Sequence, residues 1–282
     1  MTMLSINTNV GALKAASASY SVNKSMETSM QRLSTGKRIN SAADDAAGHQ
    51  IANRMTAEIM GLKQAIRNAA DAQALMGTAE GAIEEIQVML LRMRELAVQS
   101  SNSTNSAADR ASLELEARQL ELEIKRTADN TRFAGEELLN GDFSGDVSAN
   151  VRTFQIGSDV GQTIELSIPQ LQATGVTIGY SVAHSIGSFT GAQSAIGSID
   201  DGLSTLAVVR ANIGAKMNRL DHTIANLENV VTNLSQAKGR IVDADFATET
   251  ANLARTQVLQ QASMAMLSQA NASKQNILAL FQ

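Results

Sequence analysis

The chain has 282 residues and a mass of 29.8 kDa, with six Phe, two Tyr and no Trp. So few aromatic side chains leave little material for the core of an ordinary globular domain, whereas a single proline permits long helices. The net charge of -5 offers no basic surface for nucleic acid, and the absence of cysteine excludes disulfides and thiolate metal sites. No stretch reaches the about 18 apolar residues that span a bilayer. We therefore expect a mainly helical protein that binds no nucleic acid and inserts in no membrane.

The first predicted element is a helix within residues 1–40. Its apolar side chains recur at largely helical spacing from Ile6 to Leu33, but Ser, Asn and Thr fill the positions between them. An amphipathic helix of this kind is marginal in water when nothing covers its apolar stripe. We expect it to need a partner.

The second predicted helix has an apolar residue at every seventh position. This seam consists of Met55, Leu62, Ala69, Met76, Ile83, Leu90 and Ala97. A heptad seam predicts one long helix that packs along its length on another. We expect it to begin near Ser41, which has capping-box spacing to Asp44, and to end near the Ser/Asn-rich run 100–106. A further helix with the same spacing at Ser106 and Asp109 is expected to fold back antiparallel.

Residues 147–185 change from a helical period to an alternation of apolar and polar residues. Phe154 and Ile156 alternate first, residues 157–161 supply two glycines for a turn, and residues 164–168 alternate again. This pattern predicts a β-hairpin, with a third strand over residues 176–182. The region is too small for a domain of its own, so we expect it to pack on the helices.

A third seam at seven-residue intervals predicts another long helix in the C-terminal part of the chain. It comprises Leu206, Ile213, Leu220, Leu227, Leu234 and Ile241. Because such helices are stable mainly when their stripes are buried, the seams together predict a long antiparallel helical bundle or coiled coil.

Residues 246–282 form the last predicted helix, whose apolar stripe is interrupted by Gln and Asn. Residues 1–40 contain five basic residues and one acidic residue, whereas residues 241–282 contain three acidic and two basic residues. Charge therefore weakly favours pairing of the N- and C-terminal helices with each other. Two amphipathic ends with uncovered apolar stripes are typical of segments that become ordered when copies of a protein assemble.

No constellation of residues indicates catalysis, a cofactor or a metal. His49, His184 and His222 lie far apart in the sequence and belong to no metal-binding motif. Gly36 and Lys37 lack the preceding glycine of a phosphate-binding loop, and the glutamates of the predicted helices are better explained as a solvated face. We expect a protein that is not an enzyme and binds no cofactor.

Both ends of the chain resemble bacterial flagellin, over roughly residues 1–170 and 190–282. The matching segments are 5–9, 32–48, 92–99, 210–220, 240–249 and 260–271. The resemblance implies a rod-like helical domain over 41–245, with the hairpin region at about 147–185. It also implies that 1–40 and 246–282 form an inner domain that orders in the filament. The short hairpin region leaves no room for the large variable outer domains of other flagellins.

The same resemblance implies a structural subunit of the bacterial flagellar filament that polymerises non-covalently into a helical tube for swimming. The expected location is secreted and extracellular. The N-terminus does not read as a cleavable signal peptide, which agrees with export through the flagellum's own channel. Expected partners are further copies, the export apparatus and its chaperone, and the filament cap and junction proteins. The alternative is a hook-filament junction-type protein with similar helical ends.

Two groups of candidate site residues follow. The first is expected to mediate polymerisation in the inner core and consists of Ile6, Val10, Leu13, Leu33, Leu259, Met266, Ile277 and Leu280. The second matches the surface that the flagellin-sensing Toll-like receptor reads in some family members. It consists of Leu90, Arg92, Leu96 and Glu116, and the same residues are also candidates for a surface between subunits. Neither group predicts chemistry beyond binding.

Overall fold

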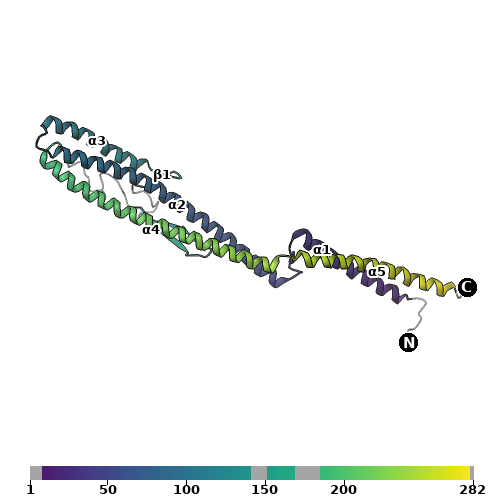
Figure 1. Cartoon of the computed structure of the whole chain (residues 1–282). Helices are drawn as coiled ribbons and strands as arrows, with labels where there is room; N and C mark the ends of the chain where they lie inside the picture. The colour runs from purple at the N-terminus through teal and green to yellow at the C-terminus, as the bar shows by residue number, and fades with distance from the viewer. Residues whose placement is uncertain (1–7, 141–150, 169–184, 280–282) are drawn as a thin grey trace. The chain divides into compact units, whose positions relative to one another are not determined.

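The computed structural model describes residues 8–140, 151–168 and 185–279 (Figure 1). Over these residues the chain forms five α-helices and two small antiparallel sheets. The helices are α1 Val10–Thr35, α2 Ala46–Ser100, α3 Ala107–Asn130, α4 Phe189–Val242 and α5 Phe246–Ala279. The strands are β1 Arg132–Phe133, β2 Glu136–Glu137, β3 Val151–Gln155 and β4 Thr163–Ser167. The mainly helical class predicted from the sequence is confirmed.

The chain divides into two compact units. The terminal unit comprises Met1–Ile59 and Thr232–Gln282, and the central unit comprises Met60–Val231. Both boundaries fall inside helices, within α2 and α4. The domain limits that the resemblance implies, at residues 40 and 246, fall after the end of α1 and at the start of α5, and they stay a prediction.

The central unit is a bundle of α2, α3 and α4, which lie alongside one another in Figure 1. The heptad seam of α2 is buried from Leu62 to Ala97, and Met55, ahead of this unit, is half-buried. On α4 the seam is buried from Leu206 to Leu227. Ile124 of α3 joins the same apolar cluster. The predicted bundle is confirmed, because its seams are the core.

Polar contacts cross between α2 and α4 at positions where the apolar rows are interrupted. The Gln73 side chain donates a hydrogen bond to the Asp221 carboxylate at 2.5 Å. Further along, Arg210 donates to the Gln87 side chain at 2.8 Å and lies 3.6 Å from Glu80. At the far end of the pair, Arg94 bonds Asp200 at 2.6 Å.

The start of α2 differs from the prediction. The helix begins at Ala46 rather than near Ser41. The Asp44 carboxylate accepts hydrogen bonds from the backbone N–H groups of Asn40 and Ser41, which closes a turn before the helix. The cap is Asp45, whose carboxylate accepts the Gly48 N–H at 2.8 Å. The capping-box spacing of Ser41 and Asp44 therefore marks a turn before the helix and not the start of the helix.

The start of α3 agrees with the prediction. The Ser106 hydroxyl accepts the Asp109 N–H at 3.3 Å, and the Asp109 carboxylate accepts the Ser106 N–H at 3.0 Å. Both halves of the capping box are formed, so two of the free N–H groups at this helix start are satisfied.

The predicted hairpin is confirmed as β3 and β4, which pair antiparallel with Phe154 opposite Ile164. Ile164, Leu166 and Ile168 are buried in the central cluster, so the hairpin packs on the helices. The predicted third strand over 176–182 lies outside the described residues. The β1–β2 hairpin was not predicted. Its turn uses Ala134 and Gly135 at positive φ.

In the terminal unit, α1 and α5 lie side by side (Figure 1), which confirms the predicted pairing of the two ends. Gly36 ends α1 in the left-handed conformation, at φ 68°. The segments beyond each helix also pair, since the Arg38 N–H donates to the Val242 carbonyl at 2.6 Å and the Ala244 N–H to the Gly36 carbonyl at 3.0 Å. These backbone bonds fix the helix pair at one end.

Candidate functional site

Among the described residues of α1 and α5, the buried side chains are polar, and apolar side chains such as Val22, Met26 and Leu253 are half-buried. Glu249 of α5 is only 6% exposed. One of its carboxylate oxygens accepts a hydrogen bond from Arg32 at 2.9 Å and the other accepts the Ser29 hydroxyl at 2.9 Å. Ser19 of α1 and Thr256 of α5 are also buried. Buried polar groups are tolerated when they are hydrogen-bonded, and both Glu249 oxygens are.

Electrostatics keep Glu249 ionised. Burial alone raises the pKa of the Glu249 carboxyl, but the hydrogen bonds from Arg32 and Ser29 outweigh burial and hold the pKa below its usual value. The charged form is therefore the one that joins the two helices. Losing that charge weakens the contact.

Two further contacts join the helices along their length. The Gln260 amide donates to the Asn23 side chain at 2.9 Å. The Asn9 amide donates to the Ala270 carbonyl at 3.2 Å, and a Cβ on Gly11 would lie 3.8 Å from the Ala270 methyl group. Small and polar residues thus contact each other across the two helices at these two points.

The apolar side chains of this helix pair lie mostly on its surface. Leu13 is 62% exposed on α1, and Met266 is 65% exposed on α5. Other exposed apolar side chains of the pair are Val10, Tyr20, Met30, Phe246, Val258, Leu259 and Met264. Pairing of α1 with α5 leaves these side chains uncovered. Several large apolar side chains exposed on one helix pair are typical of an interaction site.

The predicted polymerisation residues are placed as follows. Val10, Leu13, Leu259 and Met266 are exposed, and Leu33 is half-buried. Ile6 and Leu280 lie outside the described residues, and Ile277 lies on α5 with its side chain outside that description. The Ser29–Glu249–Arg32 contact was missed, because polar residues in an amphipathic pattern are read as solvent-facing. A usable signal was the opposite charge balance of the two ends.

The second predicted group is divided between core and surface. Leu90 and Leu96 are each 1% exposed and belong to the central cluster. Arg92 and Glu116 are half-exposed and form an ion pair at 2.8 Å. Arg92 also contacts Glu95 at 3.0 Å. The hydrogen bonds to Glu116 and Glu95 raise the pKa of Arg92 above its ordinary value. Only the two charged members are accessible in this chain.

The described residues contain no cluster of His, Cys, Asp and Glu that could hold a metal ion. His49 lies 3.3 Å from the Asn53 amide, and His222 is exposed. His184 lies outside the described part of the chain. Over the same residues, none of the helices combines the length and hydropathy that crossing a membrane requires.

Two models of known protein families match this chain, one in its N-terminal part and one in its C-terminal part. The model described as the bacterial flagellin N-terminal helical region matches residues 6–144, and the model described as the bacterial flagellin C-terminal helical region matches residues 196–281. This chain belongs to the bacterial flagellin family. It is therefore a structural subunit of the bacterial flagellar filament, a self-assembled polymer outside the cell.

Relatives among the flagellins cover the whole chain. Flagellin from Halalkalibacterium halodurans is 43% identical over 278 residues, which are 98% of this chain and 99% of that protein. Flagellin A of Vibrio cholerae is 33% identical over 383 residues, covering 99% of this chain and 100% of that protein. The present chain, at 282 residues, is a short flagellin.

Solved structures agree. The crystal structure of Bacillus cereus flagellin matches with a TM-score of 0.50 and 31% identity, covering 61% of this chain and 94% of that one. A putative flagellar hook-associated protein from Vibrio parahaemolyticus matches with a TM-score of 0.61, covering 71% of this chain and 100% of that one. At 16% identity the second match shows a shared fold alone. The junction-type alternative is therefore not better supported than flagellin.

Proposed function

We propose that copies of this flagellin associate through the apolar side chains that α1 and α5 leave exposed. In this proposal residues 1–40 and 246–282 form the inner domain of the filament, and residues 41–245 form the rod around it. The observation that supports it is the exposure of the Leu13 and Met266 side chains on the surface of this helix pair.

The physical argument concerns what covers these stripes. Polar contacts such as Glu249 with Ser29 help to hold α1 on α5, and the pair leaves large apolar side chains such as Leu13 and Met266 exposed. An exposed leucine or methionine gains free energy when a second copy covers it. If the contact joins two different faces, each added copy presents the same free face again. Such heterologous contacts that do not close on themselves produce an open helical polymer.

Truncation tests this proposal. Removing residues 1–35 or 250–282 should leave a soluble, mostly helical protein that no longer polymerises, because the apolar stripes are lost while the central bundle is kept. Electron microscopy of the purified chain should give long uniform tubes, and circular dichroism should report the helicity of the truncated forms. Tubes formed by either truncated chain would contradict the assignment.

We also propose the partners that the family implies. These are the flagellar export apparatus and its chaperone during secretion, and the cap and junction proteins at the two ends of the filament. A non-enzymatic role is part of the same proposal and fits a structural protein family. Co-purification of the full chain with the export chaperone tests the first partner. Failure of the chaperone to co-purify with the full chain would contradict this partner.

A second proposed function is recognition by the flagellin-sensing Toll-like receptor. Arg92 and Glu116 are its accessible residues, while Leu90 and Leu96 support the surface from the core. An arginine offers a planar fork of donors suited to a binding surface. Arg92→Ala should lower receptor activation by the monomer and leave its thermal unfolding nearly unchanged. Arg126→Ala is the matched control, since Arg126 is also an exposed, ion-paired arginine of the central unit. Equal receptor responses from both variants would exclude this function.

A further inference from the structure

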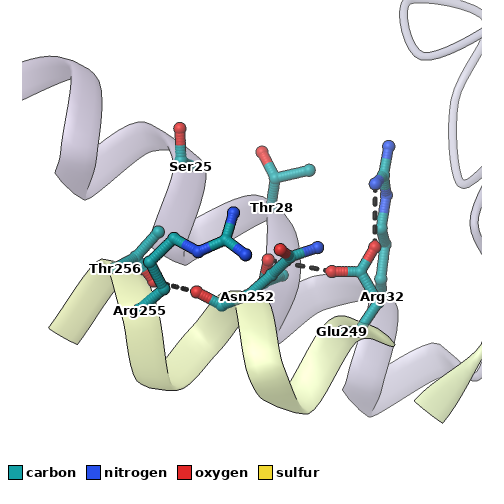
Figure 2. A pocket seen from close by; sticks show the side chains of 8 residues that line it. Ser25, Thr28, Arg32, Glu249, Asn252, Arg255 and Thr256 are labelled. Atoms are coloured by element: carbon teal, nitrogen blue, oxygen red, sulfur yellow. Dashed lines mark hydrogen bonds and ion pairs between the residues drawn. The ribbon is translucent and has the colours of Figure 1, made fainter. Parts of the chain in front are cut away.

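A polar pocket of about 350 Å³ lies on the surface of the α1–α5 pair (Figure 2). It is lined by Ser25, Thr28, Ser29, Arg32, Glu249, Asn252, Arg255 and Thr256. Its ionisable groups are two arginines and one glutamate, so its formal charge is positive. The apolar stripes proposed for assembly do not line it.

Both carboxylate oxygens of Glu249, the glutamate of the pocket, already accept hydrogen bonds. One Glu249 carboxylate oxygen accepts Arg32 and the other accepts Ser29. Arg255 is therefore the cation that Glu249 does not neutralise. Arg255 is exposed, and among the described residues it makes no hydrogen bond or ion pair. Figure 2 shows its guanidinium between the two helices, on the side of Ser25 and Thr28.

The rest of the pocket cannot supply the missing negative charge. The hydroxyls of Ser25 and Thr28 donate to the carbonyls of Ser21 and Lys24, each at 3.0 Å, which leaves them only neutral acceptor lone pairs. Arg32 adds a further unused donor, because its buried Nε has no partner within the described part of the chain. Spare N–H donors and a positive charge fit a carboxylate, which a guanidinium binds through two parallel hydrogen bonds.

The charge distribution of the chain indicates where that carboxylate comes from. The terminal unit contains ten basic and seven acidic residues, whereas the central unit contains thirteen basic and twenty-one acidic residues. The surplus carboxylates therefore belong to the central unit. Every further copy in a polymer of identical chains carries this acidic unit and so offers the carboxylates that the pocket lacks.

We propose that Arg255 binds an Asp or Glu side chain from the central unit of a second copy of this chain. This inference rests on the proposed assembly function and names a specific contact within it. The contact adds an orientation to the association that apolar stripes alone do not provide, because a guanidinium and a carboxylate bond in one planar geometry. It also makes assembly sensitive to salt, since ions screen exposed charge pairs.

Substitution of Arg255 tests the contact. Arg255→Gln keeps the length and polarity of the side chain but removes its charge. It should raise the critical concentration for polymerisation about three- to tenfold and flatten its dependence on sodium chloride. Arg255→Lys should fall between this variant and the wild type. Arg54→Gln is the control, because Arg54 is another exposed arginine of the terminal unit, and it should behave as the wild type.

Circular dichroism of the monomers should give the same helicity for all variants, since Arg255 is exposed and makes no hydrogen bond or ion pair within the described residues. Equal critical concentrations and salt dependence for Arg255→Gln and Arg54→Gln would overturn the proposal. Absence of wild-type filaments would instead count against the proposed assembly function, so the two failures are distinguishable.

Cross-linking identifies which part of a neighbouring copy lies at Arg255 in the filament. The chain has no cysteine, so Arg255→Cys can carry a single benzophenone label in filaments mixed with isotopically labelled wild-type chains. Mass spectrometry should find cross-links to residues 60–231 of the labelled copies. Cross-links confined to the terminal unit would overturn the proposal. So would Arg255-dependent binding of sulfate by the monomer together with filaments of unchanged critical concentration, because the pocket would then hold a small anion.

Discussion

The substitution Leu13→Ala measures how much one exposed side chain contributes to polymerisation. Leucine has three more carbon atoms than alanine, and each contributes about 0.8 kcal/mol when removed from water. Leu13 is 62% exposed in the chain, so a neighbouring copy can cover a little under two thirds of that amount, about 1.5 kcal/mol. This corresponds to about a tenfold increase in the critical concentration. Alanine has the higher helix propensity, so α1 itself is not weakened.

The assay is sedimentation of filaments over a series of protein concentrations, with thermal unfolding of the monomer measured in parallel. The unfolding temperature should change little, because the Leu13 side chain is mostly in water before assembly. Gln31→Ala is the control, since Gln31 is an exposed polar residue of the same helix. A critical concentration for Leu13→Ala within twofold of that control would refute the role given to the exposed stripe.

Three further results are expected. Ile83→Ala truncates a fully buried seam residue and should lower the free energy of unfolding of the central unit by about 2–5 kcal/mol. Calorimetry would detect this change. A decrease below about 1 kcal/mol would mean that the seam is not the core. Ser106→Ala breaks the capping box with Asp109 and should cost about 1 kcal/mol, while Ser103→Ala in the preceding loop should cost nothing measurable by the same method. The pKa of Glu249 is lowered in the folded chain, so its contribution to α1–α5 pairing is present above its ordinary value near 4.5 and is lost as pH falls through the folded pKa. Helicity of the monomer should therefore drop in acid more steeply for the wild type than for Glu249→Gln, and parallel curves would contradict the role of this carboxylate.

The bundle could be predicted from the sequence because its core follows one simple rule. An apolar residue at every seventh position, such as Met76 and Ile83 on α2 or Leu206 and Ile213 on α4, has few stable arrangements other than a buried seam. The β3–β4 hairpin was predictable for a similar reason, since alternation with glycines between the strands specifies it. In both cases local pattern and tertiary packing agree.

The errors occurred where polar residues had more than one possible partner. Asp44 satisfied the spacing of a helix cap, but its carboxylate closes a turn and Asp45 caps α2 instead. Ser29 and Glu249 looked like solvent-facing residues, and only their pairing across more than two hundred positions buries them. Spacing along a chain gives no information about a partner so distant in sequence. The β1–β2 hairpin was missed because two-residue strands are too short to show alternation.

The polar contacts between α2 and α4 have a consequence for the lattice. A purely apolar seam repeats every seven residues, so two helices can slide by one repeat and still match. Such a slip would break the Gln73–Asp221, Arg210–Gln87 and Arg94–Asp200 contacts together. The central unit is thereby held in one register of α2 against α4. Every copy in a polymer then presents the same spacing of surface groups along this bundle.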